Sequence, residues 1–176
     1  MIRPIKEKAA KFLINQKLKE HKFDELDFSR IFKRSYAYLV LMPKDEKDFF
    51  HAVEVLNFLK ESKKNVTAMT DDFRVSLLPT AFKVSAVGHG INDKTRLGLP
   101  AKKFLNQLRD IQFDVVIDTN RQEELFYNFV ANFINPPVRI GFSGQNADKY
   151  FNLQIVNNKS EPEISYQNLL NCLKMF

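Results

Sequence analysis

Cysteine is almost missing from this sequence. Cys172 is its one cysteine, so no internal disulfide can form, which indicates a reducing compartment. Tryptophan is absent, and 5 glycines and 7 prolines in 176 residues exclude a collagen-like or low-complexity chain. No apolar run approaches the roughly 20 residues that a membrane-spanning helix needs. What remains is the composition of one ordinary globular domain, with 44% hydrophobic and 27% charged residues.

The spacings of common catalytic and metal sites are also missing. The histidines, His21, His51 and His89, are scattered and far from the cysteine, so we expect no metal and no cofactor. The segment 88–90 (GHG) lacks the Gly-x-Gly-x-x-Gly spacing of a phosphate-binding loop, and we interpret His89 as a loop residue. No nucleophile elbow or Ser/His/Asp arrangement can be read.

A secretion signal is not indicated by the first residues. They read MIRPIKEK and lack an apolar core followed by a small-residue cleavage site. Together with the lone cysteine, this predicts a cytoplasmic protein, with peripheral attachment to the inner membrane as a further expectation.

Positive charge gathers at the N-terminal end. The net charge is +6, and residues 1–34 hold ten Lys and Arg against five Asp and Glu. Apolar residues recur at three- and four-residue spacing over 4–22, which predicts a basic amphipathic helix. Its apolar positions are Ile5, Ala9, Phe12, Leu13 and Leu18. The basic positions that we assign to a membrane or partner face are Lys6, Lys8, Lys11, Lys17 and Lys19.

Two interpretations of this helix stay open. It packs against its own domain or an oligomer partner with its lysines in solvent, or it lies on an anionic membrane surface. Nucleic acid is not expected as a partner, because beyond residue 34 no basic stripe alternates with aromatic residues.

Apolar runs alternate with amphipathic segments from residue 35 onward. Strands are expected at 36–42, 65–70, 82–87, 113–118, 138–142 and 152–156. Helices are expected at 46–60, 100–109, 122–133 and 163–175, with a brief helix between 71 and 79. This alternation predicts an α/β fold, a three-layer Rossmann-like sandwich whose mainly parallel sheet has helices on both faces. We therefore divide the chain into a helical extension, 1–34, and a single domain, 35–176.

Two stretches of this body resemble a known family. The segment 108–119 (LRDIQFDVVIDT) resembles the central signature of the ADP-heptose:lipopolysaccharide heptosyltransferases, glycosyltransferase family 9, and 139–142 (RIGF) resembles the strand that follows it there. The resemblance implies one half of a GT-B fold, the acceptor-side N-terminal domain, with a sugar or glycolipid acceptor. In that family a second domain binds the nucleotide-sugar donor.

The same resemblance implies site residues. The family's candidate base, the Asp of a Gly-Asp pair, corresponds to Asp48, and Lys47 stands where the family has glycine. The implied acceptor-binding residues are Lys47, Asp118, Asn120 and Arg121. Both acidic residues keep a second interpretation: Asp48 as a helix N-terminal carboxylate and Asp118 as a carboxylate that orders its loop. Glutamates at 123 and 124 would repel an anionic acceptor.

Three functions follow as hypotheses. The preferred one is a heptosyltransferase-like domain linked to lipopolysaccharide or other envelope glycan synthesis that is incomplete or inactive by itself. The second is half of a split glycosyltransferase with Asp48 as base, completed by a homo-oligomer or a separate donor-binding chain. The third is a non-enzymatic scaffold whose basic helix docks on a membrane or partner.

Overall fold

A single sheet of six parallel strands forms the centre of the molecule, in the order β3-β2-β1-β4-β5-β6. The computed structural model describes residues 3–17, 27–157 and 161–176. The strands are β1 (Ala37–Leu41), β2 (Asn65–Asp71), β3 (Val87–His89), β4 (Val115–Asp118), β5 (Val138–Phe142) and β6 (Leu153–Ile155). This strand order is that of a Rossmann-like doubly wound sheet, so the predicted fold class is confirmed.

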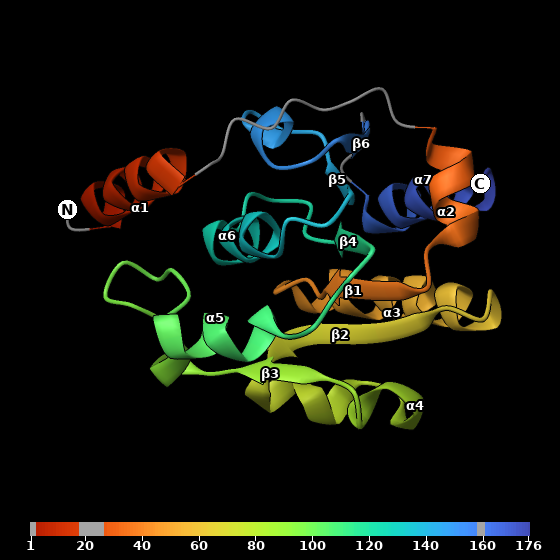
Figure 1. Ribbon diagram of the computed structural model, residues 1–176, viewed down its shortest axis with the longest axis horizontal. Coiled ribbons are helices and arrows are strands. Elements are labelled where there is room, and N and C mark those ends of the chain that lie inside the picture. The colour runs from red at the N-terminus through yellow and green to blue at the C-terminus, as the bar shows by residue number, and fades with distance from the viewer. Residues whose placement is uncertain (1–2, 18–26, 158–160) are drawn as a thin grey trace.

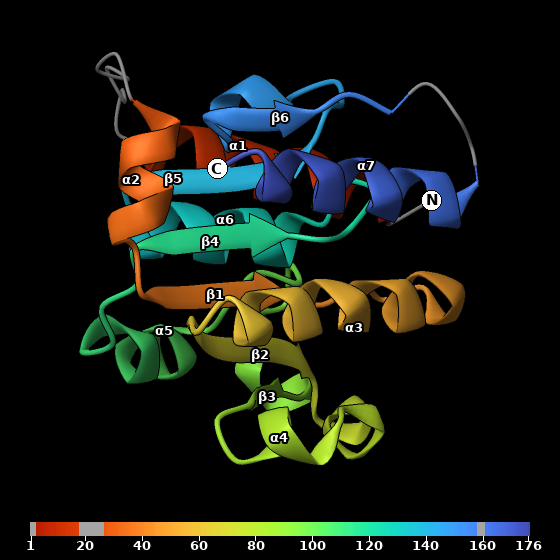
Figure 2. The same ribbon diagram turned by 90° about the vertical axis from the view of Figure 1, so that its right-hand side faces the viewer.

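Helices cover both faces of the sheet and make the three layers (Figure 1). One face carries α2 (Phe28–Arg34), α3 (Glu46–Glu61), α4 (Thr80–Lys83) and α7 (Pro162–Lys174). The other carries α1 (Arg3–Lys17), α5 (Lys102–Arg109) and α6 (Leu125–Ile134). The described residues also form three short 3-10 turns: η1 (Asp72–Leu77), η2 (Ile91–Asp93) and η3 (Ala147–Lys149). Figure 2 shows α3 and α7 side by side in front of the sheet.

Strand β1 is buried on both faces, which explains its unbroken apolar sequence. In β1, Tyr38 and Val40 pack toward α3 and α7, whereas Leu39 and Leu41 pack toward α5 and α6. All four are 0% exposed. Successive side chains of a strand point to opposite faces, so a strand covered on both sides needs apolar residues at every position.

The predicted third strand at 82–87 is wrong. Residues Thr80–Lys83 form the one-turn helix α4, in which Phe82 is buried in the core, and the strand β3 begins only at Val87. A helix of one turn is too short to show a helical periodicity, so its buried aromatic residue resembles part of a strand. Within the segment 1–34 the structure also contains a second helix, α2, whose first turn is capped by Asp27 through the backbone N–H of Arg30 at 3.1 Å.

The N-terminal helix packs with a different face from the one its sequence indicates. The part of the predicted helix beyond Lys17 lies outside the described residues. Ala10 and Ile14 are buried, 0% and 2% exposed, in a cluster with Phe129 of α6. The expected apolar stripe points away: Ile5 is 68% and Phe12 61% exposed. Because Ala10 is small, it allows a close approach of the two helices that the larger residues of the stripe would prevent.

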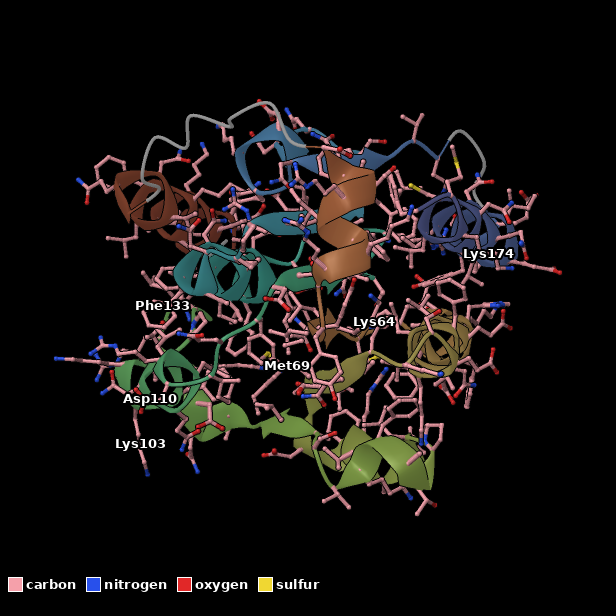
Figure 3. The ribbon with its side chains drawn as sticks, turned by 45° about the vertical axis from the view of Figure 1, so that its right-hand side comes forward. Lys64, Met69, Lys103, Asp110, Phe133 and Lys174 are labelled. Carbon is pink, nitrogen blue, oxygen red and sulfur yellow. The ribbon has the colours of Figure 1, made fainter. Side chains whose placement is uncertain are left out.

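A partly buried lysine closes the end of α2. The Lys64 ammonium donates to the carbonyl oxygens of Phe32 at 2.9 Å and Ser35 at 2.8 Å, and Figure 3 labels this lysine below α2. These contacts satisfy carbonyl groups that have no partner within the helix. Burial lowers the pKa of Lys64. The lysine thus fixes α2 against the start of β1.

Candidate functional site

Polar residues that follow two neighbouring strands meet at one place. The strands β1 and β4 are neighbours, and here the sheet's winding reverses direction. In open α/β sheets this is where ligands bind, beyond the carboxyl ends of the strands. A hollow of about 260 Å³ lies there. It is lined by Pro43, Lys44, Asp45, Asp48, Asn120, Arg121, Gln122 and Glu124.

An ion pair crosses this hollow. The Arg121 guanidinium donates from Nε to both carboxylate oxygens of Asp48, at 3.1 and 3.0 Å, and its Nη2 lies 2.9 Å from Oδ1. The Asp48 side chain is 6% exposed and that of Arg121 23%. The hydrogen bond to Asp48 raises the pKa of Arg121. The predicted base and a predicted acceptor-binding residue therefore bind each other.

The first turn of α3 carries the acidic side of the hollow. Asp45 is the N-cap, and its Oδ1 accepts from the backbone N–H of Lys47 at 2.9 Å and of Asp48 at 3.1 Å. These amides could otherwise receive a ligand's phosphate, but the cap occupies them. Lys47 is exposed and is not among the residues that line the hollow in the described part of the chain. Lys44 lines it instead.

The two glutamates expected to repel an anionic acceptor each have a lysine partner. Glu124 forms an ion pair with Lys44 across the hollow. Glu123 pairs with Lys11 of α1 at 2.6 Å, and Lys11 also contacts Glu7 at 3.2 Å. Lys11 therefore lies on the side of α1 that faces its own domain. The surroundings of the hollow carry alternating charges rather than an acidic patch.

Asp118 orders the loop that leaves β4. It is 3% exposed, and its Oδ1 accepts from the backbone N–H of Asn120 at 2.9 Å and from the Asn120 side-chain amide at 2.7 Å. Burial raises the pKa of Asp118 to about 7, although both hydrogen bonds from Asn120 oppose that change. Asn120 in turn accepts from the backbone N–H of Lys44 at 3.2 Å through its Oδ1. Asp118 and Asn120 thus shape the hollow by joining its two loops.

Two hydroxyl groups hold this loop in place, and neither could be singled out from the sequence. Thr119 donates from Oγ1 to the Leu41 carbonyl at 2.7 Å, which ties the end of β4 to the end of β1. Tyr166 of α7 donates to the Thr119 carbonyl at 2.6 Å. Single threonine and tyrosine residues give no spacing signal, so their part in the site depends on the three-dimensional fold.

A second, smaller hollow of about 50 Å³ lies on the other side of the same loop. Asn120, Arg121 and Gln122 line both hollows, and Gln145 and Asn146 of the loop after β5 line the smaller one. Side-chain amides both donate and accept hydrogen bonds, as hydroxyl groups do. The two hollows together present the chemistry that a hydroxylated ligand requires.

His89 is not the loop residue expected from the sequence. It is the last residue of β3 and is 0% exposed. Its Nε2 forms a 2.9 Å hydrogen bond with the Tyr127 hydroxyl, and its Nδ1 lies 3.4 Å from Asp71 Oδ1. Burial lowers the pKa of His89 to about 4. The glycines beside it made the segment resemble a loop, whereas parallel pairing with β2 makes it a strand.

The part of the chain that the structure describes offers neither a metal centre nor a membrane-spanning helix. No group of three or more His, Cys, Asp and Glu side chains there could hold a metal ion. No helix among the same residues is both long and apolar enough to cross a bilayer.

Fold and site together define a Rossmann-like α/β domain with a polar hollow at its switch point. Among solved structures, the chain is similar to the crystal structure of the glycosyl transferase family 9 protein from Veillonella parvula DSM 2008, with a TM-score of 0.59 and 17% sequence identity. The match covers 81% of this chain and 42% of that protein, so the chain spans less than half of its length. This confirms the predicted resemblance at the level of the fold. No family model matches the sequence, and a search of curated proteins finds no match.

Proposed function

We propose that this chain is a glycosyltransferase-like domain that binds a sugar or glycolipid acceptor beside β1 and β4 and does not transfer sugar by itself. The Asp48–Arg121 ion pair across the hollow is the observation that carries this proposal. We further propose that the domain serves lipopolysaccharide or other envelope glycan synthesis, as the heptosyltransferase-like motifs at 108–119 and 139–142 suggest.

The composition of the hollow supports a sugar ligand. Carboxylates, amides and cations line it, and these groups accept from and donate to sugar hydroxyls. Its volume of about 260 Å³ is slightly below the roughly 300–1,000 Å³ usual for small-molecule pockets, which suits one sugar unit. The paired charges, Lys44 with Glu124 and Arg121 with Asp48, leave the hollow polar without a strong net charge.

The state of Asp48 supports the absence of transfer. A general base must reach the proton that it removes within hydrogen-bond distance. Both oxygens of Asp48 already accept from Arg121, and the carboxylate is 6% exposed, so an acceptor hydroxyl would have to compete with the guanidinium for it.

The test measures binding and transfer separately. The 176-residue chain is titrated with heptose, other monosaccharides and oligosaccharides of the envelope core while amide NMR shifts are followed, and is then incubated with ADP-sugars plus each acceptor. We expect shift changes around Asp48, Asn120 and Arg121 that Asp48→Asn weakens, and no transfer product. Glu54→Gln, at an exposed position of the same helix, is the matched control. Unchanged spectra would refute acceptor binding, and measurable transfer would refute the inactive state.

A second candidate function is favoured by the extent of the structural match. Because the chain aligns with 42% of a glycosyltransferase, a homo-oligomer or a separate donor-binding chain could complete an enzyme in which Asp48 is the base. This alternative requires that the completed assembly turns over and that Asp48→Asn abolishes turnover while the far-UV spectrum stays the same. It also requires Arg121 to leave Asp48 when the acceptor binds.

A further inference from the structure

The outward face of α1 carries an apolar stripe that the chain's own core does not use. Ile5, Phe12 and Leu13 are 68%, 61% and 36% exposed. Positions seven or eight apart in a helix share one side, so the three residues form one continuous stripe. The helix is held to the domain from its other side, by Ala10, Ile14 and the ion pair of Lys11 with Glu123. The stripe is therefore presented by a fixed helix.

Lysines flank this stripe. Lys8 lies three positions after Ile5 and four before Phe12, which places it beside both, and Lys6 lies seven positions before Leu13. Both lysines are exposed. The acidic residue of this stretch, Glu7, contacts Lys11 on the domain side of the helix at 3.2 Å. The outward face thus combines apolar side chains with positive charge, which is the pattern of a helix that lies in a membrane interface.

A neighbouring hollow combines apolar and basic residues in the same way. Between α5 and α6 a surface hollow of about 590 Å³ is lined by apolar residues that include Leu105, Phe129 and Phe133. Its charged lining residues, Lys102 and Arg109, are both cations. Figure 3 shows Phe133 between α6 and α5, below α1, and Lys103 of α5 reaching outward on the same side. The hollow borders the cluster that holds Ala10 and Ile14 of α1.

We propose that this side of the molecule, the outward face of α1 together with the neighbouring α5–α6 hollow, docks on an anionic membrane surface. Charge complementarity selects this partner, because the free charges beside the apolar stripe and in the hollow are positive. The docked face is joined to the candidate site: Glu123, the partner of Lys11, also lines the smaller hollow. A membrane at α1 would therefore lie next to the loop that shapes the site. The proposal does not depend on sugar binding.

The test is co-sedimentation of the whole chain with phosphatidylcholine vesicles, with and without phosphatidylglycerol. We expect binding to the vesicles that contain phosphatidylglycerol and weak binding to the others. Each basic residue near an anionic surface strengthens binding about fivefold, so Lys6→Glu/Lys8→Glu should weaken it by roughly twentyfold or more. Phe12→Ser should weaken it as well, because the stripe no longer enters the interface.

The matched control is Lys83→Glu/Val84→Ser. These substitutions replace an exposed lysine and a 96% exposed valine at α4, which lies on the opposite face of the sheet. They should leave vesicle binding unchanged. All substitutions lie at exposed positions, and equal urea midpoints verify the fold. Equal binding to both vesicle types, or equal loss in the control, would overturn the proposal. The proposal would also be overturned if the chain does not bind vesicles but forms a dimer that Phe12→Ser dissociates. The stripe would then bind a second copy of the chain.

Discussion

Arg121 and Asp48 lie 73 positions apart in the sequence and are joined by contacts of 2.9 to 3.1 Å. One residue comes from the first turn of α3 and the other from the loop after β4. Their ion pair therefore links the loops of the two halves of the sheet, at the place where a ligand would bind. Its energy depends on the poor access of water to Asp48.

Removing Arg121 alone should lower the free energy of unfolding more than removing both members of its ion pair with Asp48. In Arg121→Gln the Asp48 carboxylate, 6% exposed, loses the guanidinium that donates to both of its oxygens. Loss of one partner of a fully buried pair costs about 3–5 kcal/mol, and since Arg121 is partly exposed we expect about 2 kcal/mol in the free energy of unfolding. Urea denaturation at neutral pH measures this loss.

The double variant Asp48→Asn/Arg121→Gln is its control. It leaves no buried charge, so most of the lost stability should return, with a coupling energy of about 1 kcal/mol or more in the double-mutant cycle. A coupling energy near zero would show that the two side chains contribute as an ordinary surface pair.

Asp118 should make the protein less stable as the pH rises from about 4 to 7. Its pKa is about 7 in the folded chain and 3.8 as the ordinary value, so over this interval the folded state holds a proton that the unfolded state has released. Stability is then lost with rising pH, by at most about 1.4 kcal/mol per pH unit for one proton. Asp118→Asn should flatten that decline and can still accept the Asn120 hydrogen bonds. Urea midpoints from pH 4 to 8 measure this decline in stability. If the midpoints of the natural chain and of Asp118→Asn change with pH in the same way, Asp118 does not cause the decline.

His89 should make the protein less stable as the pH falls, which is opposite to the effect of Asp118. Burial lowers its pKa from 6.5 to about 4, so between these values the unfolded chain takes up a proton that the folded chain does not. The stability that neutral His89 provides is therefore complete above pH 6.5 and lost as the pH falls toward 4. His89→Gln, which can keep a hydrogen bond to Tyr127, should be less sensitive to acid over this range. His51→Gln, at a partly exposed position, removes a histidine that is not fully buried and is the comparison variant.

Two neighbouring glycines should respond differently to alanine. A Cβ at Gly141 of β5 would lie 2.6 Å from atoms of the Phe151 ring, whereas at Gly144 no atom lies within 4 Å. We expect Gly141→Ala to lower the free energy of unfolding by about 1–3 kcal/mol, the usual cost of overpacking. Gly144→Ala should stay within about 0.5 kcal/mol. Thermal denaturation of the two variants side by side tests this, and equal effects would show that Phe151 moves aside freely.

The sequence predicted the sheet well, for a physical reason. Strands buried on both faces are rich in apolar residues. Residues 36–42 form an unbroken apolar run, and 113–118 and 138–142 are apolar at most positions, so these stretches located β1, β4 and β5 correctly. Asp48 and Arg121 were implied by the family resemblance, and they lie near one another because the carboxyl ends of parallel neighbours share one edge of the sheet.

The remaining features depend on contacts that no local pattern records. The choice of Lys44 rather than Lys47 at the hollow follows from the way α3 begins, with Asp45 as its cap. His89 became part of a strand through pairing with β2, although two glycines surround it. The packed face of α1 was set by the fit of Ala10 against α6, which hydrophobicity alone did not indicate.

The two outer strands of the sheet, β3 and β6, have three residues each. A short edge offers few unpaired backbone groups to a strand from another molecule, which guards against aggregation and strand exchange. This sheet is thus poorly suited to growth by adding strands at either side. Any assembly of this chain, with itself or with a donor-binding partner, is therefore expected to use helix surfaces and the loops above β1 and β4, and to leave the sheet's own hydrogen bonding unchanged.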